Sequence, residues 1–183
     1  TSAMAIICNP GAESRNNEIV SIEPLIVKHF ERIEKIIFPG TVDGGDVMMV
    51  NNLFYIGVSD RTNKDGAKQF IDILWKYGFS GSIVSLEKVL HLKTGVNYLD
   101  NSNLLVSGEF IDKPVFESFN KIVIPEHEAY AANSLWINDF VLVPKGFSKS
   151  LRLIEEAGYE TIVVDVSEFE KLDGGLSCLS LRF

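Results

Sequence analysis

The chain has 183 residues, of which 46% are hydrophobic and 23% charged, and its formal net charge is −8. These values fit one compact globular domain with a sizeable core. The acidic balance argues against nucleic acid as a partner, because phosphates call for a basic face. No apolar run in the sequence approaches the length needed to span a bilayer, so a membrane is not an expected partner either.

Cysteine and histidine are scarce. The two cysteines, Cys8 and Cys178, argue against a disulfide framework and fit a reducing cytoplasm. Residues 1–9 lack the basic start and long apolar stretch of a secretion signal, which points to the same compartment. The three histidines form no metal-ligand cluster at a recognisable spacing, so we expect neither a metal nor another cofactor.

The pattern of the first half of the chain predicts alternating strands and helices. An apolar run at 3–8, ended by Asn-Pro-Gly, is typical of a buried strand before a turn. Apolar residues recur at helical spacing over 17–33, and the run 36–38 before Pro-Gly predicts a second strand. A hairpin then follows over 47–58, with a helix over 64–77 and a strand over 82–86.

The order hairpin, helix, strand recurs further along the chain. It starts again near Asn97, with a helix at 114–119 and a strand at 121–124, and near Ser134, with a helix at 148–157 and a strand at 161–164. Every hairpin has a polar turn, at 51–52, 101–102 and 138–139. Self-similarity with a period in the forties indicates α/β modules that close into a ring or stack. No linker interrupts them, so we expect one domain over 1–183.

Polar residues occupy the loop before each hairpin: Asp43 and Asp46, then His91, then Asn133. At the end of the chain, Cys178 follows a Gly-Gly turn and precedes a strand-like tail at 179–183. Each signal is weak alone, because Asp and Gly form ordinary turns and a lone cysteine is usually buried and inert. In a ring of repeats, however, equivalent loops converge on the axis. A thiolate, a base and a carboxylate would suit attack on a cationic guanidinium group.

Five segments together resemble the dimethylarginine dimethylaminohydrolases, a family of the guanidino-group-modifying (pentein) superfamily. They are residues 9–15, 42–47, 57–63, 90–94 and 173–178. The resemblance runs along the whole chain and implies a pentein-type α/β propeller of repeated ββαβ modules, which agrees with the repeats described above.

The resemblance also implies roles for individual residues. Cys178 corresponds to the nucleophile, His91 to the general acid and base, and Asp43 to the carboxylate that contacts the guanidinium and the histidine. Arg15 and Arg61 correspond to residues that hold the substrate's α-carboxylate, for which a guanidinium fork is well shaped.

Two acidic residues complete the predicted site. Asp173 corresponds to a residue near the amino-acid end of the substrate, and Asp46 is grouped with the substrate-binding residues. A zinc site at Cys178 and His91 would have only two ligands, too few for a structural site.

Two features bear on the subtype. Deiminases and amidinotransferases carry an acidic residue two positions after the histidine; Lys93 occupies that place here and favours the dimethylarginine hydrolases. Family members also have an upstream module with a Glu-Asp pair and a mobile lid. We expect the domain to be incomplete at its N-terminus, the alternative being a protein that has lost the module.

The sequence thus predicts a cysteine hydrolase that converts Nω-methylated arginine into citrulline and a methylamine. The expected partner is a small guanidino substrate, and a homodimer is left open. The alternatives are an arginine deiminase or amidinotransferase acting on another guanidino compound, and a non-catalytic binding protein of the same fold.

Overall fold

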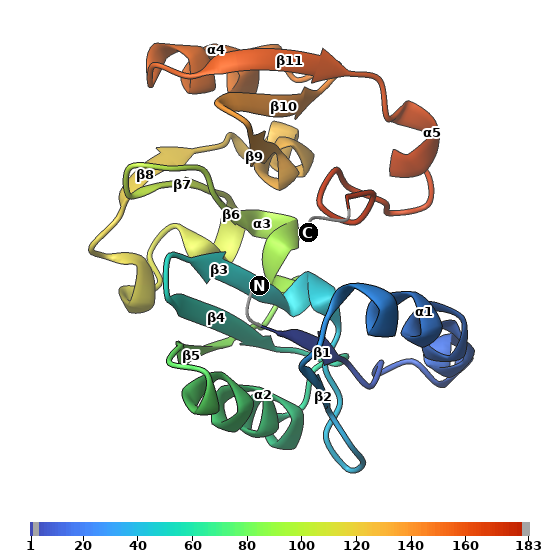
Figure 1. Cartoon of the computed structure of the whole chain (residues 1–183). Coiled ribbons are helices and arrows are strands. Elements are labelled where there is room, and N and C mark those ends of the chain that lie inside the picture. The colour runs from blue at the N-terminus through green and yellow to red at the C-terminus, as the bar shows by residue number, and fades with distance from the viewer. Residues whose placement is uncertain (2–3, 181–183) are drawn as a thin grey trace. The chain divides into compact units, whose positions relative to one another are not determined.

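The computed structural model describes residues 1 and 4–180, and its repeating unit is a three-stranded sheet (Figure 1). The most regular copy comprises β3 (Val47–Val50), β4 (Leu53–Val58), α2 (Lys64–Lys76) and β5 (Ser80–Ser85). Strand β4 pairs antiparallel with β3 and parallel with β5, which gives the strand order β3-β4-β5. Helix α2 provides the crossover that a parallel pair needs.

Two further copies follow along the chain. The second has β6 (Val96–Tyr98), β7 (Asn103–Val106) and β8 (Asn120–Val123); the third has β9 (Leu135–Ile137), β10 (Phe140–Pro144), α4 (Ser148–Glu156) and β11 (Glu160–Val164). Both repeat the pattern of one antiparallel and one parallel pairing. The predicted ββαβ order is therefore confirmed in the first and third copies, and the strand pairing in all three.

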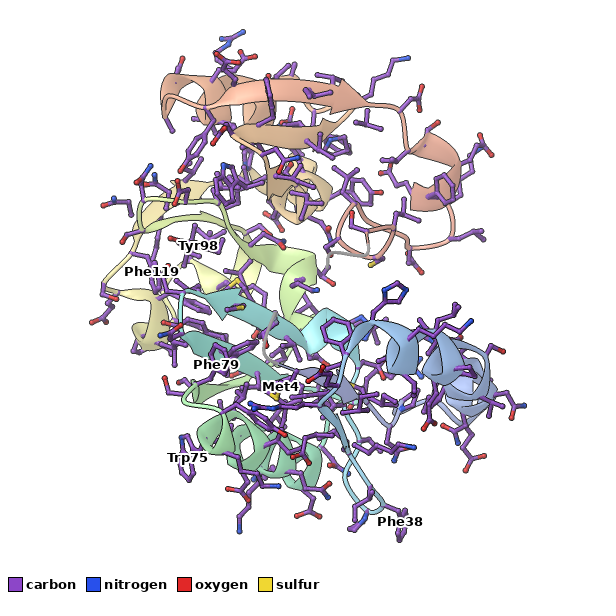
Figure 2. All side chains as sticks on the ribbon, viewed as in Figure 1. Met4, Phe38, Trp75, Phe79, Tyr98 and Phe119 are labelled. Atoms are coloured by element: carbon purple, nitrogen blue, oxygen red, sulfur yellow. The ribbon has the colours of Figure 1, made fainter. Side chains whose placement is uncertain are left out.

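The second module differs from the prediction in its crossover. The short 3₁₀ turns η3 (Gly108–Phe110) and η4 (Pro114–Phe116) stand where the sequence predicted a helix over 114–119. Their aromatic residues still face inward, since Phe110 and Phe116 are fully buried and their rings lie 6.4 Å apart. Phe119 stacks edge-on against Tyr98, with the ring centroids 6.4 Å apart (Figure 2). Aromatic side chains thus fill the part of the core that the apolar face of the predicted helix would have filled.

The polar hairpin turns are confirmed, and their geometry explains their composition. Asn51, Asn101, Ser102, Asn138 and Asp139 all have positive φ, between 48° and 72°. Asn and Asp tolerate this left-handed region better than other non-glycine residues, and tight hairpins require it.

The start of the chain forms a two-stranded sheet. Strands β1 (Ala5–Ile7) and β2 (Ile33–Lys35) pair in parallel across α1 (Asn16–His29), which follows the 3₁₀ turn η1 (Glu13–Arg15). The predicted strand at 36–38 is wrong, because β2 lies three residues earlier in the chain. Ile36 is buried, but Ile37 is 65% and Phe38 88% exposed, and Phe38 projects from a loop (Figure 2).

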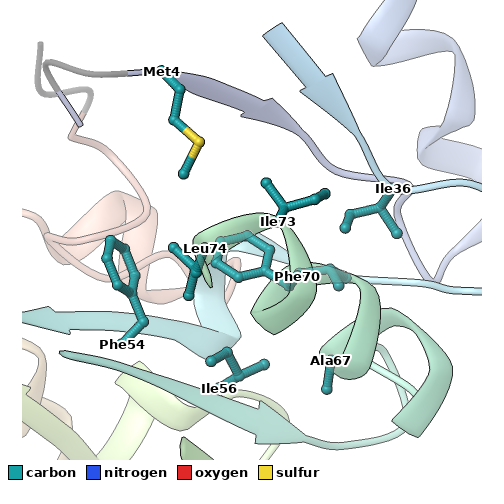
Figure 3. Close-up of a cluster of buried hydrophobic side chains, with 9 residues drawn as sticks. Met4, Ile36, Phe54, Ile56, Ala67, Phe70, Ile73 and Leu74 are labelled. Atoms are coloured by element: carbon teal, nitrogen blue, oxygen red, sulfur yellow. The ribbon is translucent and has the colours of Figure 1, made fainter. Parts of the chain in front are cut away.

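The chain divides into two compact units, residues 1–92 and residues from Lys93 onward. In the first, α2 packs its buried residues on the sheet beside Met4 and Ile36 (Figure 3). In the second, a separate cluster contains Leu99, Leu105 and Ile154. The expectation of a single domain over 1–183 stays a prediction.

The chain continues through α5 (Ser167–Glu170) into a series of turns. The predicted tail strand at 179–183 is wrong at Leu179, which lies in a turn; residues 181–183 lie outside the described part. Among the described residues, we find no helix of sufficient length and apolarity to cross a membrane.

Candidate active site

Asp43 and His91 form the centre of the site in the first unit. Asp43 precedes the 3₁₀ turn η2 (Gly44–Asp46), and His91 precedes α3 (Leu92–Gly95). The Nε2 atom of His91 lies 3.1 Å from Oδ2 of Asp43. A Cβ at Gly45 would lie 2.8 Å from Cγ of His91, so glycine lets the ring lie against the main chain.

Asp43 is held as a carboxylate. It is only 4% exposed, and its Oδ1 accepts a hydrogen bond of 2.9 Å from the main-chain nitrogen of Gly11. Burial raises the pKa of Asp43, but the hydrogen bonds from His91 and Gly11 and the charges of His91 and Arg15 outweigh it, so the pKa is lowered. An ionised Asp43 can orient the imidazole of His91 and stabilise its protonated form.

Asp46 fixes the segments on both sides of this pair. It is fully buried, and Oδ2 accepts hydrogen bonds from the hydroxyls of Ser59 (2.8 Å) and Thr62 (2.6 Å). Oδ1 accepts from the main-chain nitrogen of Leu92, next to His91, at 2.9 Å. The hydroxyl of Thr62 in turn accepts from the nitrogen of Asp43 at 3.0 Å. These contacts give Asp46 a positioning role; its predicted contact with substrate stays a prediction.

Arg15 connects this centre to α1. Its guanidinium is half exposed, lies 3.5 Å from Oδ2 of Asp43 and forms an ion pair of 2.9 Å with Glu18. Its Nε also donates to Glu18, at 3.0 Å and 3.2 Å. The guanidinium of Arg15 thus binds the carboxylate of Glu18 through two of its nitrogens. Its predicted contact with a substrate carboxylate stays a prediction.

Arg61 lies in the loop after β4. Its main-chain nitrogen donates to the hydroxyl of Ser59 at 3.0 Å, so the loop that carries Arg61 is tied to Asp46 through Ser59. The side chain is partly exposed. The proposed contact of Arg61 with a substrate carboxylate stays a prediction.

Cys178 and Asp173 belong to the second unit. Both side chains are exposed, and Asp173 has a positive φ of 59° that turns the chain into Gly174. Two residues of the 3₁₀ helix η5 (Glu126–Asn133) hold this turn: Tyr130 donates to the carbonyl of Gly174 at 2.6 Å, and Asn133 accepts from the nitrogen of Ser177 at 2.8 Å.

The structure thus brings Arg15, Asp43, Asp46 and His91 into one network. Sequence reasoning missed Glu18, Ser59, Thr62 and Tyr130. Glu18 stands three residues after Arg15, a spacing that pairs opposite charges on a helix, but the others depend on contacts between distant segments. Within the described residues, we find no group of three or more His, Cys, Asp or Glu side chains placed to hold a metal ion.

Comparisons with known proteins give the class to which the chain belongs. The family model described as "Arginine deiminase" matches residues 25–129, more than half of the chain. The chain therefore belongs to the class of proteins that the arginine deiminase family model describes.

Individual relatives narrow the assignment. The N(G),N(G)-dimethylarginine dimethylaminohydrolase of Pseudomonas aeruginosa is 54% identical over 184 residues, a match that covers 100% of this chain and 72% of the relative. The protein of that name from Streptomyces coelicolor is 34% identical over 180 residues, covering 98% of this chain and 69% of the relative. The chain belongs to the dimethylarginine dimethylaminohydrolase family.

A solved structure gives the same result for the fold. The P. aeruginosa dimethylarginine dimethylaminohydrolase, as a cysteine-to-serine mutant complexed with citrulline, matches with a TM-score of 0.98 at 54% identity, over 100% of this chain and 72% of that chain. The predicted pentein-type α/β fold is confirmed.

Proposed function

We propose that this protein is a cysteine hydrolase that cleaves Nω-methylated arginine into citrulline and a methylamine. The observation that carries the proposal is 54% identity, over the whole chain, to a dimethylarginine dimethylaminohydrolase. The hydrogen-bonded pair of Asp43 and His91, together with an exposed thiol at Cys178, supports it.

In the first half of the proposed reaction, the Cys178 thiolate attacks the central carbon of the protonated guanidinium. The C–S bond forms as the C–N bond to the methylated nitrogen breaks, and His91 supplies the proton that the departing amine takes. The product of this half is a covalent thiouronium-type adduct.

In the second half, His91 accepts a proton from water, and the resulting hydroxide attacks the same carbon. The tetrahedral intermediate collapses: the C–S bond breaks, its electron pair stays on the restored thiolate, and the hydroxyl proton passes to solvent as the carbonyl of citrulline forms. Asp43 stabilises the imidazolium form of His91 in both halves. Arg15 and Arg61 hold the α-carboxylate, and Asp173 and Asp46 complete the binding residues.

A second candidate is an arginine deiminase, which the matching family model favours. It would use the same chemistry but release ammonia from unmethylated arginine. Three finer points belong to the proposal: a single pentein domain, a homodimer that sedimentation would detect, and a cytoplasmic location, where a reducing environment would keep the Cys178 thiol unmodified.

The test is citrulline release from asymmetric dimethylarginine by the full-length protein, with Cys178→Ser as the inactive variant and Cys8→Ser as its matched control. Activity lost only in Cys178→Ser would support the proposal. Turnover of arginine but not of dimethylarginine would move the assignment to a deiminase. Inactivity towards every guanidine tried would overturn the proposal in favour of a binding protein.

A further inference from the structure

Two residues of η5 bind the main chain of the loop that carries Cys178. We call residues 173–178 the thiol loop. The hydroxyl of Tyr130 donates to the carbonyl of Gly174 at 2.6 Å, and the side-chain oxygen of Asn133 accepts from the nitrogen of Ser177 at 2.8 Å. Because a 3₁₀ helix has three residues per turn, side chains three apart lie on one face. Tyr130 and Asn133 therefore hold the thiol loop from the same side.

The contact with Asn133 is close and buried. Asn133 is 8% exposed, and a Cβ at Gly175 would lie 2.6 Å from its Cγ. Glycine at 175 is what allows the amide to lie against the main chain. This interlocking leaves the loop little freedom to shift without losing the hydrogen bond to Ser177.

Asn133 also completes the turn in which Cys178 lies. The nitrogens of Cys178 and Leu179 both donate to the carbonyl of Gly175, at 3.0 Å and 3.2 Å, so a helical turn starts there. The first nitrogens of such a turn lack a partner within it. Asn133 accepts from one of these, Ser177, the residue directly before the thiol.

The helix η5 is itself held by contacts with the rest of the second unit. Asn97 donates to the carbonyl of Ala132 at 2.8 Å, and Ala132 lies in the buried core of the second unit. The ring of Tyr130 stacks on Phe147 with centroids 5.4 Å apart. The thiol loop is thus tied to the core of its unit through two side chains.

We propose that Tyr130 and Asn133 are positioning residues that hold the thiol loop in one shape and so set the direction and reactivity of the Cys178 thiol. The inference rests on the proposed role of Cys178 as nucleophile. Burial, and then the charges of Glu170 and Cys178, raise the pKa of Tyr130, which keeps its hydroxyl a donor to Gly174. Asn133 supplies an acceptor without placing a negative charge beside the thiolate.

The experiment measures Cys178 without substrate, so that it is separate from the test of the proposed function. In a Cys8→Ser background, the rate of iodoacetamide alkylation is followed against pH for Asn133→Ala, Asn133→Asp and Tyr130→Phe. The matched control is Tyr159→Phe, because the Tyr159 hydroxyl also donates to a main-chain carbonyl, that of Asp100, at 3.0 Å. Circular dichroism checks that each variant folds.

Tyr130→Phe and Asn133→Ala are expected to change the alkylation rate several-fold and to lower kcat about 10- to 100-fold with little change in KM, because a small misplacement of the nucleophile slows the chemical step. Asn133→Asp keeps the acceptor but adds a charge, so its alkylation profile should move to higher pH. Tyr159→Phe should match the parent protein.

The proposal is overturned if the folded Tyr130→Phe and Asn133→Asp variants match Tyr159→Phe in alkylation and in kcat. If Asn133→Ala does not fold, these two variants still decide the question. Should the parent protein turn over no guanidine, the proposed function fails, whereas the alkylation rates still report whether the two residues control the thiol.

Discussion

Asp43 and His91 are joined by a hydrogen bond of 3.1 Å although 48 residues separate them along the chain. An ionised Asp43 can only accept, so in the neutral imidazole Nε2 carries the proton and Nδ1 is left to exchange protons with a reacting group. The pair therefore fixes both the orientation and the tautomer of His91.

Replacement of Asp43 by Asn should remove this control. The amide can donate as well as accept, and it no longer stabilises the imidazolium, so kcat for citrulline release should fall about 10²- to 10⁴-fold. Steady-state kinetics over a pH series measures the loss. Asp72→Asn, an exposed change on α2, is the matched control and should retain full activity. Equal activity of the two variants would contradict the role given to Asp43.

Asp43 should also make the protein sensitive to acid. Its pKa is lowered from the ordinary value of 3.8 in the folded state, so its contribution to stability is present above that value and is lost as the pH falls below it. Urea unfolding between pH 3 and 6 should show that the unfolding free energy falls more steeply with decreasing pH for the parent protein than for Asp43→Asn. Parallel curves would show that Asp43 is not the group responsible.

The ion pair between Arg15 and Glu18 has a consequence for substrate binding. If Arg15 holds the α-carboxylate, Glu18 competes for the same fork at 2.9 Å. Glu18→Gln should therefore lower KM for dimethylarginine with kcat unchanged. Because both side chains are at least half exposed, the gain should be about fivefold at most.

A substrate without the carboxylate provides the control for Glu18→Gln. The α-amide of dimethylarginine should show the same KM with both proteins, since it has no charge for Arg15 to bind. A higher KM for dimethylarginine itself in Glu18→Gln would mean that Glu18 supports the site instead of competing with the substrate.

Local sequence signals predicted the modules well. Asn51, Asn101 and Asn138 mark the hairpin turns in the sequence, because asparagine adopts the positive φ that these turns need. This requirement acts within four residues. Strand β2 was misplaced because it contains Glu34 and Lys35, whereas the more apolar run beside it has two exposed residues. A short strand at an edge is set by its partner, here β1, and not by its own composition.

The site was predicted less completely, and for a related reason. Asp43, His91 and Cys178 stood out because their residue types carry chemistry and their motifs resemble a family. Tyr130 and Glu128 did not, since each acts on a segment far along the chain: Tyr130 on Gly174, 44 residues away, and Glu128 on Ser150, 22 residues away. Such contacts follow from the packing of η5 and leave no periodic pattern in the sequence.

Glu128 provides a test of stability separate from catalysis. Its carboxylate is 7% exposed and accepts hydrogen bonds from the nitrogen and hydroxyl of Ser150, at 2.7 Å and 2.6 Å, and from the nitrogen of Lys149 at 3.2 Å. It thus caps α4 from another segment. Glu128→Ala leaves these donors without their acceptor and should lower the unfolding free energy by about 2 kcal/mol.

The matched control is Glu126→Ala, an exposed change on the same short helix, which should alter the unfolding free energy by less than about 0.5 kcal/mol. Burial raises the pKa of Glu128. The hydrogen bonds from Ser150 and Lys149 and the charge of His127 outweigh this effect, so the pKa is lowered from 4.5. The difference between the two variants, measured by urea unfolding, should therefore be full at pH 7 and shrink as the pH falls below 4.5. A difference that persists undiminished at pH 3 would show that lost packing, and not the lost carboxylate, destabilises Glu128→Ala.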